Sequence, residues 1–162
     1  MSYFAAVLAR HRDRWRAAEV DLADCESVDD IAEVAREVPG EIRLLVVEQD
    51  DEYAVLARID ADDEPRVFLS DGHAADAYPL AAVIAAELEE IGGEDIDEEL
   101  FGDAPIRHDC APFGDPSVVE DLGTPSPELL ELCAHEGTLP VDLILAVCER
   151  AGCVEAFEAV RA

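Results

Sequence analysis

Cysteine and histidine are the residue types best suited to bind a transition metal. A group of them lies in the last forty residues: Cys133, His135, Cys148 and Cys153. The spacing, C-x-H followed by C-x4-C, differs from the patterns usual in structural zinc sites. Cys148 falls on the apolar stripe of a predicted helix, and a free cysteine behaves as a small buried hydrophobe. We therefore expect these cysteines to pack in the core, and we predict no metal site.

Nucleophilic catalysis needs a serine or cysteine, a base and an orienting acid brought together in space. The sequence contains no nucleophile elbow, no H-E-x-x-H and no glycine-rich phosphate loop. The triplet His108-Asp109-Cys110 lies in a stretch interrupted by proline and glycine, where no predicted element would position it. Carboxylate pairs carry no information, because 40 of the 162 residues are acidic. We predict no catalytic residue and no cofactor.

The best-placed polar cluster is the loop Ser70-Asp71-Gly72-His73, between a predicted strand and a predicted helix. Loops at strand ends often carry sites, so Asp71 and His73 would be the centre of any enzyme of unrecognised type. The same residue types are also typical of turns and helix caps, and we favour that interpretation.

The charge of the chain is strongly one-sided. Eleven basic residues, all arginine, stand against 40 acidic ones, for a formal net charge of −29. Such a field repels phosphate backbones, which disfavours direct binding of nucleic acid or anionic lipid, and it attracts a basic partner. The acidity is also compatible with a role in solubility alone.

Two charged segments could contact a partner. Arg10 to Arg16, with Trp15 inside it, could stack RNA bases, although we interpret it as a solvated hairpin tip. The acidic segment 94–103 carries apolar residues at helical offsets, which suits either a groove on a basic protein or the cover of its own core. The residues predicted to bind a partner there are Asp95, Ile96, Asp97, Glu98, Leu100 and Phe101.

Apolar periodicity predicts the elements that position these residues. Strands are expected at 2–9, 15–22, 42–48, 53–59 and 66–70, and helices at 28–38 and 79–91. The order ββαβββα, with short turns, predicts an α+β fold: a mainly antiparallel five-stranded sheet with helices packed on it. Three short helices from Ser126 onward predict a C-terminal helical subdomain.

This pattern divides the chain into three parts. We expect an α+β sheet domain at 1–91, an acidic Pro/Gly-rich connecting segment at 92–123 and a helical subdomain at 124–162 packed on the first. No segment approaches the ~20 apolar residues of a membrane span. The N-terminus lacks the basic region of a signal peptide, so we expect a cytoplasmic protein with reduced cysteines.

Several stretches together resemble the actinobacterial tRNA adenosine deaminase-associated proteins, over nearly the whole chain. They are MSYFAAVLAR, VDDIAEVAREV, LLVVEQDDEYAVLARID, PRVFLSD, GDPSVVEDLG and ELCAHEGTLPVDLILAVCERAGCVEAFEAV. The resemblance implies a process shared with a tRNA-specific adenosine deaminase. The chain is not that enzyme, because a zinc deaminase needs H-x-E and P-C-x-x-C, and neither motif occurs.

We therefore expect a non-catalytic acidic accessory protein that binds the tRNA-specific adenosine deaminase or another basic protein. One alternative is a stand-alone interaction module or homo-oligomer that uses exposed sheet edges or the C-terminal helices. The other is an enzyme centred on Asp71 and His73.

Overall fold

A single six-stranded antiparallel sheet organises the chain. The computed structural model describes residues 3–59, 65–71, 77–90, 113–134 and 139–161. The strands lie in the order β2-β1-β3-β4-β5-β6, and every neighbouring pair is antiparallel. Their bounds are β1 Tyr3–His11, β2 Arg14–Glu19, β3 Ile42–Gln49, β4 Tyr53–Arg58, β5 Arg66–Leu69 and β6 Phe113–Gly114.

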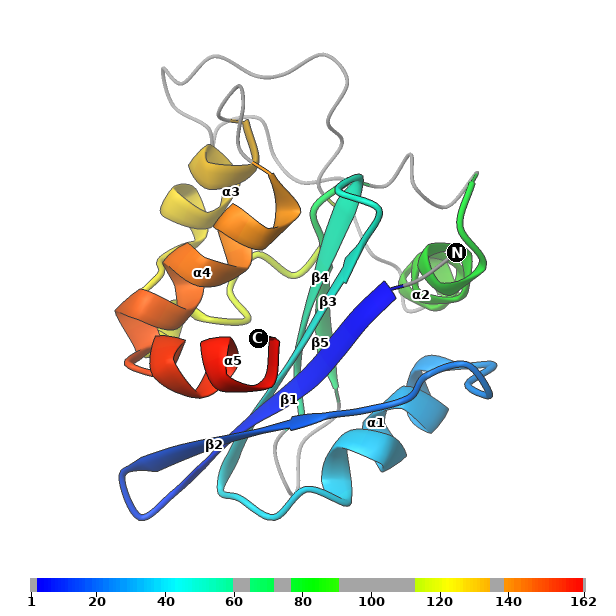
Figure 1. Ribbon diagram of the computed structural model, residues 1–162. Coiled ribbons are helices and arrows are strands. Elements are labelled where there is room, and N and C mark those ends of the chain that lie inside the picture. Colours follow the sequence, from blue (N-terminus) through cyan, green and yellow to red (C-terminus); the bar gives the residue numbers. More distant parts are fainter. Residues whose placement is uncertain (1–2, 60–64, 72–76, 91–112, 135–138, 162) are drawn as a thin grey trace.

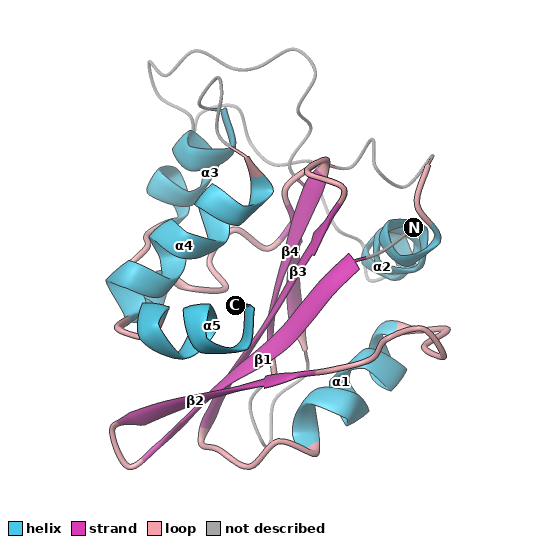
Figure 2. Cartoon of the chain, viewed as in Figure 1, coloured by secondary structure: helices cyan, strands magenta, loops and turns pink. Residues whose placement is uncertain are grey.

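Helices cover both faces of this sheet. Those of the described chain are α1 Val28–Arg36, α2 Pro79–Glu90, α3 Ser126–Ala134, α4 Pro140–Ala151 and α5 Val154–Arg161, with a 3-10 turn, η3, at Glu120–Leu122. Figure 1 shows α1 and α2 on one side of the sheet and α3, α4 and α5 on the other. Figure 2 shows the resulting three layers, with the magenta strands between the cyan helices.

The layered arrangement explains why the strands are apolar on both faces. Alternate residues of β1 belong to different cores: Val7 packs under α1 and α2, and Leu8 packs under the C-terminal helices. Both side chains are fully buried. Strands buried on both faces read as continuous hydrophobic runs, and each such side chain contributes roughly 1.5–3 kcal/mol.

The predicted α+β fold and the order ββαβββα are confirmed. Helix α1 begins as expected: Ser27 is the N-cap, and its hydroxyl accepts a hydrogen bond from the Asp30 amide at 3.2 Å. The two-residue strand β6 extends the sheet beside β5 and was not predicted, because a proline- and glycine-rich context hides so short a strand.

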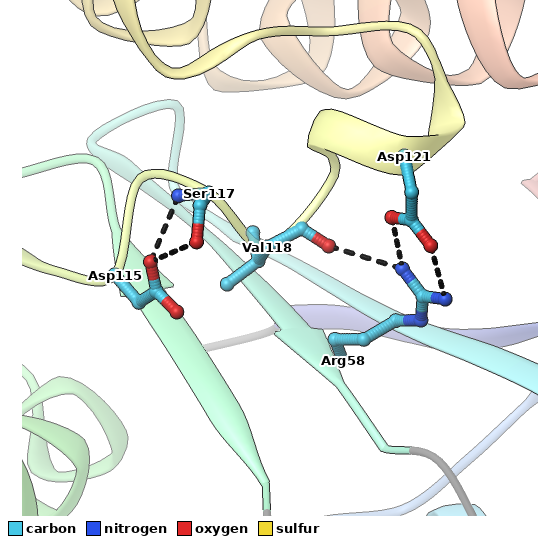
Figure 3. Close-up of polar contacts among 5 residues, drawn as sticks. All are labelled: Arg58, Asp115, Ser117, Val118 and Asp121. Atoms are coloured by element: carbon cyan, nitrogen blue, oxygen red, sulfur yellow. Dashed lines mark hydrogen bonds and ion pairs between the residues drawn. The ribbon is translucent and has the colours of Figure 1, made fainter.

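An ion pair attaches the segment after β6 to the sheet (Figure 3). The guanidinium of Arg58 on β4 donates to both carboxylate oxygens of Asp121 on η3, at 2.6 and 2.8 Å, and to the Val118 carbonyl at 3.3 Å. Asp115 accepts hydrogen bonds from the amide and hydroxyl of Ser117, and these bonds shape the turn that precedes η3.

The predicted division at 92–123 stays a prediction. Within its described part, Val118 and Val119 are fully buried in the core under the C-terminal helices. None of the helices in the described part of the chain has the length and apolarity needed to cross a bilayer.

Candidate partner-binding groove

A groove of about 280 Å³ opens between the loop before α1 and the first turns of α2. Apolar side chains from both sides form its walls, and two polar side chains of the sheet, Tyr3 and Gln49, also line it. The wall residues are Leu22, Ala23, Cys25, Pro79, Leu80 and Val83. An apolar groove with a few placed polar groups is the usual form of a binding site.

Three cross-strand neighbours line up at this end of the sheet. The register sets Tyr3 of β1 opposite Gln49 of β3, and Gln49 opposite Tyr53 of β4. The Tyr53 hydroxyl donates a hydrogen bond to the Gln49 side-chain carbonyl at 2.7 Å. Tyr53 in turn packs against the ring of Tyr78, just before α2, with the ring centroids 5.3 Å apart. The row therefore ties three strands to the start of α2.

Gln49 is the polar group best placed to meet a bound chain. It is only 5 % exposed, yet it lines the groove. Its carbonyl is occupied by Tyr53, and its amide nitrogen has no hydrogen-bond partner among the described residues. An unpaired donor at the groove favours a ligand that offers an acceptor, because the hydrogen bond would add about 0.5–1.5 kcal/mol.

Tyr3 holds the loop that forms one wall. Its hydroxyl donates to the Asp21 carboxylate at 3.0 Å and accepts from the Leu22 amide at 2.7 Å. The same carboxylate oxygen accepts from the Ala23 amide at 2.9 Å. These bonds fix the chain between β2 and α1, so the wall formed by Leu22 is preorganised.

The surroundings of the groove are acidic. A second hollow of about 370 Å³ shares Tyr3 with the groove and is lined also by Glu19 and Asp21. The β3–β4 turn at the same end of the sheet adds exposed acids from 50 to 52. None of the described arginines lines either hollow. The side chains of Glu19, Asp21, Asp24, Asp50, Asp51 and Glu52 are called here the acidic rim; all six are exposed.

The electrostatics agree with this geometry. The hydrogen bonds from the Ala23 amide and then from Tyr3 lower the pKa of Asp21, so that carboxylate stays charged. Burial raises the pKa of Tyr3, of Tyr53 and of the Cys25 thiol, so these groups stay neutral. The groove thus combines neutral walls with a negatively charged rim.

Of the predicted site residues, only Asp71 lies in the described ranges. Asp71 follows β5 at the same end of the sheet and is half-buried, but it does not line the groove. Ser70 beside it has a structural role, since its hydroxyl accepts a hydrogen bond from the Ala54 amide at 2.8 Å. Residues outside the described ranges are His73, the predicted partner-binding set Asp95, Ile96, Asp97, Glu98, Leu100 and Phe101, and the triplet 108–110.

Three of the cysteines lie in the core under the C-terminal helices. Cys133, Cys148 and Cys153 are 7 %, 0 % and 1 % exposed. A hydrogen bond with Cys153, and then burial, raise the pKa of the Cys148 thiol. In the ranges that the structure describes, no three His, Cys, Asp or Glu side chains form a group that could hold a metal ion. His135 lies outside them.

The groove itself was not predicted. Tyr3 belongs to an apolar run, and Gln49 ends a strand just before a turn, so neither residue attracts notice alone. A polar residue closing an apolar strand next to an acidic turn was the available signal. The cross-strand register that pairs Tyr3 with Gln49 depends on tertiary structure.

One family model matches the chain over residues 3–154, and its description is Rv3753c-like tRNA adenosine deaminase-associated protein. No curated protein and no solved structure matches the chain.

Proposed function

The chain belongs to the family of Rv3753c-like tRNA adenosine deaminase-associated proteins, and from this premise we propose that it is a non-catalytic accessory protein that binds a tRNA-specific adenosine deaminase. The acid-rimmed groove at Tyr3 and Gln49 is the proposed contact surface. The observation that carries the proposal is the combination of an apolar groove, the Gln49 amide at its wall and an acidic rim without arginine.

Charge supports a partner that also binds RNA. An enzyme that acts on tRNA needs a basic surface for phosphates, and the acidic rim is complementary to such a surface. With a net charge of −29, the chain would also steer the encounter over several ångströms. Rim charges of this kind mainly raise the association rate and make it salt-dependent.

The groove would supply most of the affinity. Interfaces depend on a few anchor side chains buried in preorganised pockets, surrounded by a polar rim. Leu80 and Val83 on α2 offer such a pocket opposite Leu22. The Gln49 amide adds one directional contact, which suits a backbone carbonyl of the partner.

The described chemistry supports an accessory role. The catalytic motifs of a zinc deaminase do not occur in the sequence. The buried cysteines pack in the core, and the cysteine nearest the groove, Cys25, has its pKa raised by burial, which disfavours the reactive thiolate.

Co-purification with the deaminase, followed by light scattering, tests the proposal at low (about 50 mM) and moderate (about 200 mM) salt. We expect a defined complex that weakens as salt rises. Leu80→Glu should abolish it, since a charge would enter the groove wall. Leu139→Glu is the matched control, because Leu139 is an exposed leucine away from the groove.

Absence of a complex at every salt concentration would refute the proposed function. A complex that survives Leu80→Glu and Leu139→Glu equally would refute the groove as its site.

A specific feature favours a second candidate, a homo-oligomer. Among the described residues β2 pairs only with β1, so its outer edge is open. Antiparallel pairing with β2 of a second copy, centred between Arg16 and Ala17, would set Arg14 against Glu19 of that copy. The same light-scattering measurement, made without the deaminase, would then give the mass of two chains.

A further inference from the structure

The arginines are not spread over the molecule. Eight of the ten that the structure describes lie at the end of the sheet away from the groove. Two of these, Arg58 and Arg66, lie on β4 and β5, and the other six lie on or beside the β1–β2 hairpin. They are Arg10, Arg12, Arg14 and Arg16 on the hairpin, Arg36 at the end of α1 and Arg43 at the start of β3. We call these six the arginine cluster. The blue hairpin that carries four of them extends past the helices in Figure 1.

The fold builds this cluster through the connection from α1 to β3. The Glu41 amide donates to the Arg10 carbonyl at 2.8 Å, which brings the connection against β1. Gly40 makes the approach possible, because a Cβ there would lie 2.8 Å from the Ala9 Cβ. Arg43 then donates from Nε to the Val38 carbonyl at 2.6 Å, at the C-terminal end of α1.

The cluster has unused hydrogen-bonding capacity. The ion pairs of the described chain involve Arg58, Arg150 and Arg161, and none involves a member of the cluster. Arg43 is only 9 % exposed, and its buried Nη1 has no hydrogen-bond partner among the described residues. The buried Nε of Arg10 also has no hydrogen-bond partner among the described residues.

The net charge of −29 does not set the potential at this end. The length of β1 separates the hairpin tip from the acids of the β3–β4 turn by roughly 26–30 Å, at about 3.3 Å per residue, whereas Glu19 of the rim lies three residues, or about 10 Å, from Arg16 along β2. The Debye length at physiological salt is about 8 Å, so the acids of the β3–β4 turn are screened at the hairpin. The described acids near the cluster include Asp13, Glu37 and Glu41, and also Glu33, one helical turn from Arg36 on α1, four against six arginines.

The side-chain types fit RNA better than an acidic protein. Arg14 and Arg16 project to the same face of β2, roughly 6.6 Å apart, as separate forks for phosphate oxygens. Trp15, between them in the sequence, projects to the opposite face of β2, where it is half-buried against the core under the C-terminal helices and the Arg10 guanidinium lies 5.9 Å from its ring centroid. Arginine beside an aromatic ring is the combination that contacts the backbone and stacks unpaired bases of single-stranded RNA.

From these observations we propose that the arginine cluster is an RNA-binding surface that contacts phosphates of unpaired or loop nucleotides. The proposal stands apart from the deaminase-binding groove, because it uses the opposite end of the sheet. It revises the expectation drawn from net charge alone, since the local charge at the hairpin has the opposite sign.

The test is fluorescence anisotropy of a labelled tRNA transcript with the full chain and no deaminase, over a range of salt concentrations. We expect salt-dependent binding that Arg14→Gln/Arg16→Gln weakens by about tenfold, and a log–log salt slope reduced by about 2. Arg150→Gln/Arg161→Gln is the control, since it removes the same charge from two exposed arginines outside the cluster. Unfolding midpoints of both variants report whether they fold.

Three outcomes would overturn the proposal. They are no tRNA binding at low salt, an equal loss of affinity in the two folded double variants, and binding of poly-glutamate without binding of tRNA. The last would assign the cluster to an acidic protein. Because the assay contains no deaminase, a negative result does not bear on the proposed binding of the deaminase. A negative co-purification likewise does not bear on RNA binding by the arginine cluster.

Discussion

Tyr3 and Gln49 stand directly opposite one another on β1 and β3, although 45 residues separate them in the sequence. Both line the groove, and each is tied to a further element: Tyr3 to the loop at Asp21, and Gln49 to Tyr53 on β4. The groove therefore depends on the register of three strands. A shift of β1 by one residue would turn Tyr3 to the other face of the sheet.

The bond between Tyr53 and Gln49 predicts strong coupling. Tyr53→Phe leaves the buried Gln49 carbonyl without its donor, and Gln49→Leu leaves the buried hydroxyl without its acceptor. Each should lower the free energy of unfolding by about 1–2 kcal/mol. The double variant should lose clearly less than the sum, because no unpaired polar group remains. Urea unfolding of all four proteins measures this, and simple additivity would contradict the buried hydrogen bond.

The tyrosines predict the behaviour of the protein at alkaline pH. The chain has three, Tyr3, Tyr53 and Tyr78, and burial is the main cause that raises the pKa of each above 10.0. A raised folded-state pKa gives stability that is complete below pH 10 and is lost as pH rises through the folded value. Tyrosinate absorbance should therefore appear at higher pH in the native protein than in urea.

The unfolding midpoint should fall above pH 10, and by less in Tyr53→Phe than in the parent chain. If tyrosinate absorbance appeared at the same pH in native and in urea-unfolded protein, burial would not raise the pKa of these tyrosines.

The sheet could be predicted from the sequence because both of its faces are buried. The centres of β3 and β4 are unbroken apolar runs, and the tight turns of the sheet carry residues that tolerate positive φ: Asp13 at 64° and Asp51 at 57°. Helix α1 was readable from Ser27 and its apolar spacing.

The groove could not be predicted, and of the arginine cluster only the hairpin arginines from Arg10 to Arg16 stood out in the sequence, because the rest depends on which strands become neighbours. Arg10 and Arg43 lie 33 positions apart in the sequence and come to the same end of the sheet only through the β1–β3 pairing. Net charge averages over both ends of the sheet and hides their opposite signs. Strand order is a tertiary property that local pattern does not contain.

The Arg58–Asp121 pair predicts a contrast with a surface pair. The Arg58 side chain is 4 % exposed, whereas that of Arg150, paired with Glu128, is 38 % exposed. Arg58→Met should lower the free energy of unfolding by about 2–3 kcal/mol, since it breaks two charged hydrogen bonds that hold η3 on the sheet. Arg150→Met should cost less than about 1 kcal/mol. Equal losses in chemical denaturation would show that η3 is held by apolar packing alone.

The same pair gives the acid side of the stability profile. The hydrogen bond from Arg58 lowers the pKa of Asp121 below 3.8. A lowered folded-state pKa gives stability that is present above about pH 4 and is lost as pH falls through the folded value. The Asp121 side chain is 57 % exposed, so solvent screening keeps this contribution small. The urea unfolding midpoint should decrease from pH 6 to pH 3 by less in Asp121→Asn than in the parent chain. An equal decrease in both proteins would assign the acid sensitivity to other carboxylates.

Two glycines with positive φ separate backbone strain from steric contact. Gly123 ends η3 at φ 108°, and a Cβ there would lie 2.9 Å from the Arg150 carbonyl oxygen on α4. Gly152 ends α4 at φ 86°, with no atom within 4 Å of an added Cβ.

Gly152→Ala should therefore cost only the strain of the left-handed backbone, about 1–2 kcal/mol. Gly123→Ala adds a clash with backbone that cannot rotate away, so η3 and α4 must separate, and its loss should exceed that of Gly152→Ala by at least about 1 kcal/mol. Thermal and urea unfolding of the two variants measure both losses in free energy of unfolding. If Gly152→Ala lost as much as Gly123→Ala, η3 would not pack closely against α4.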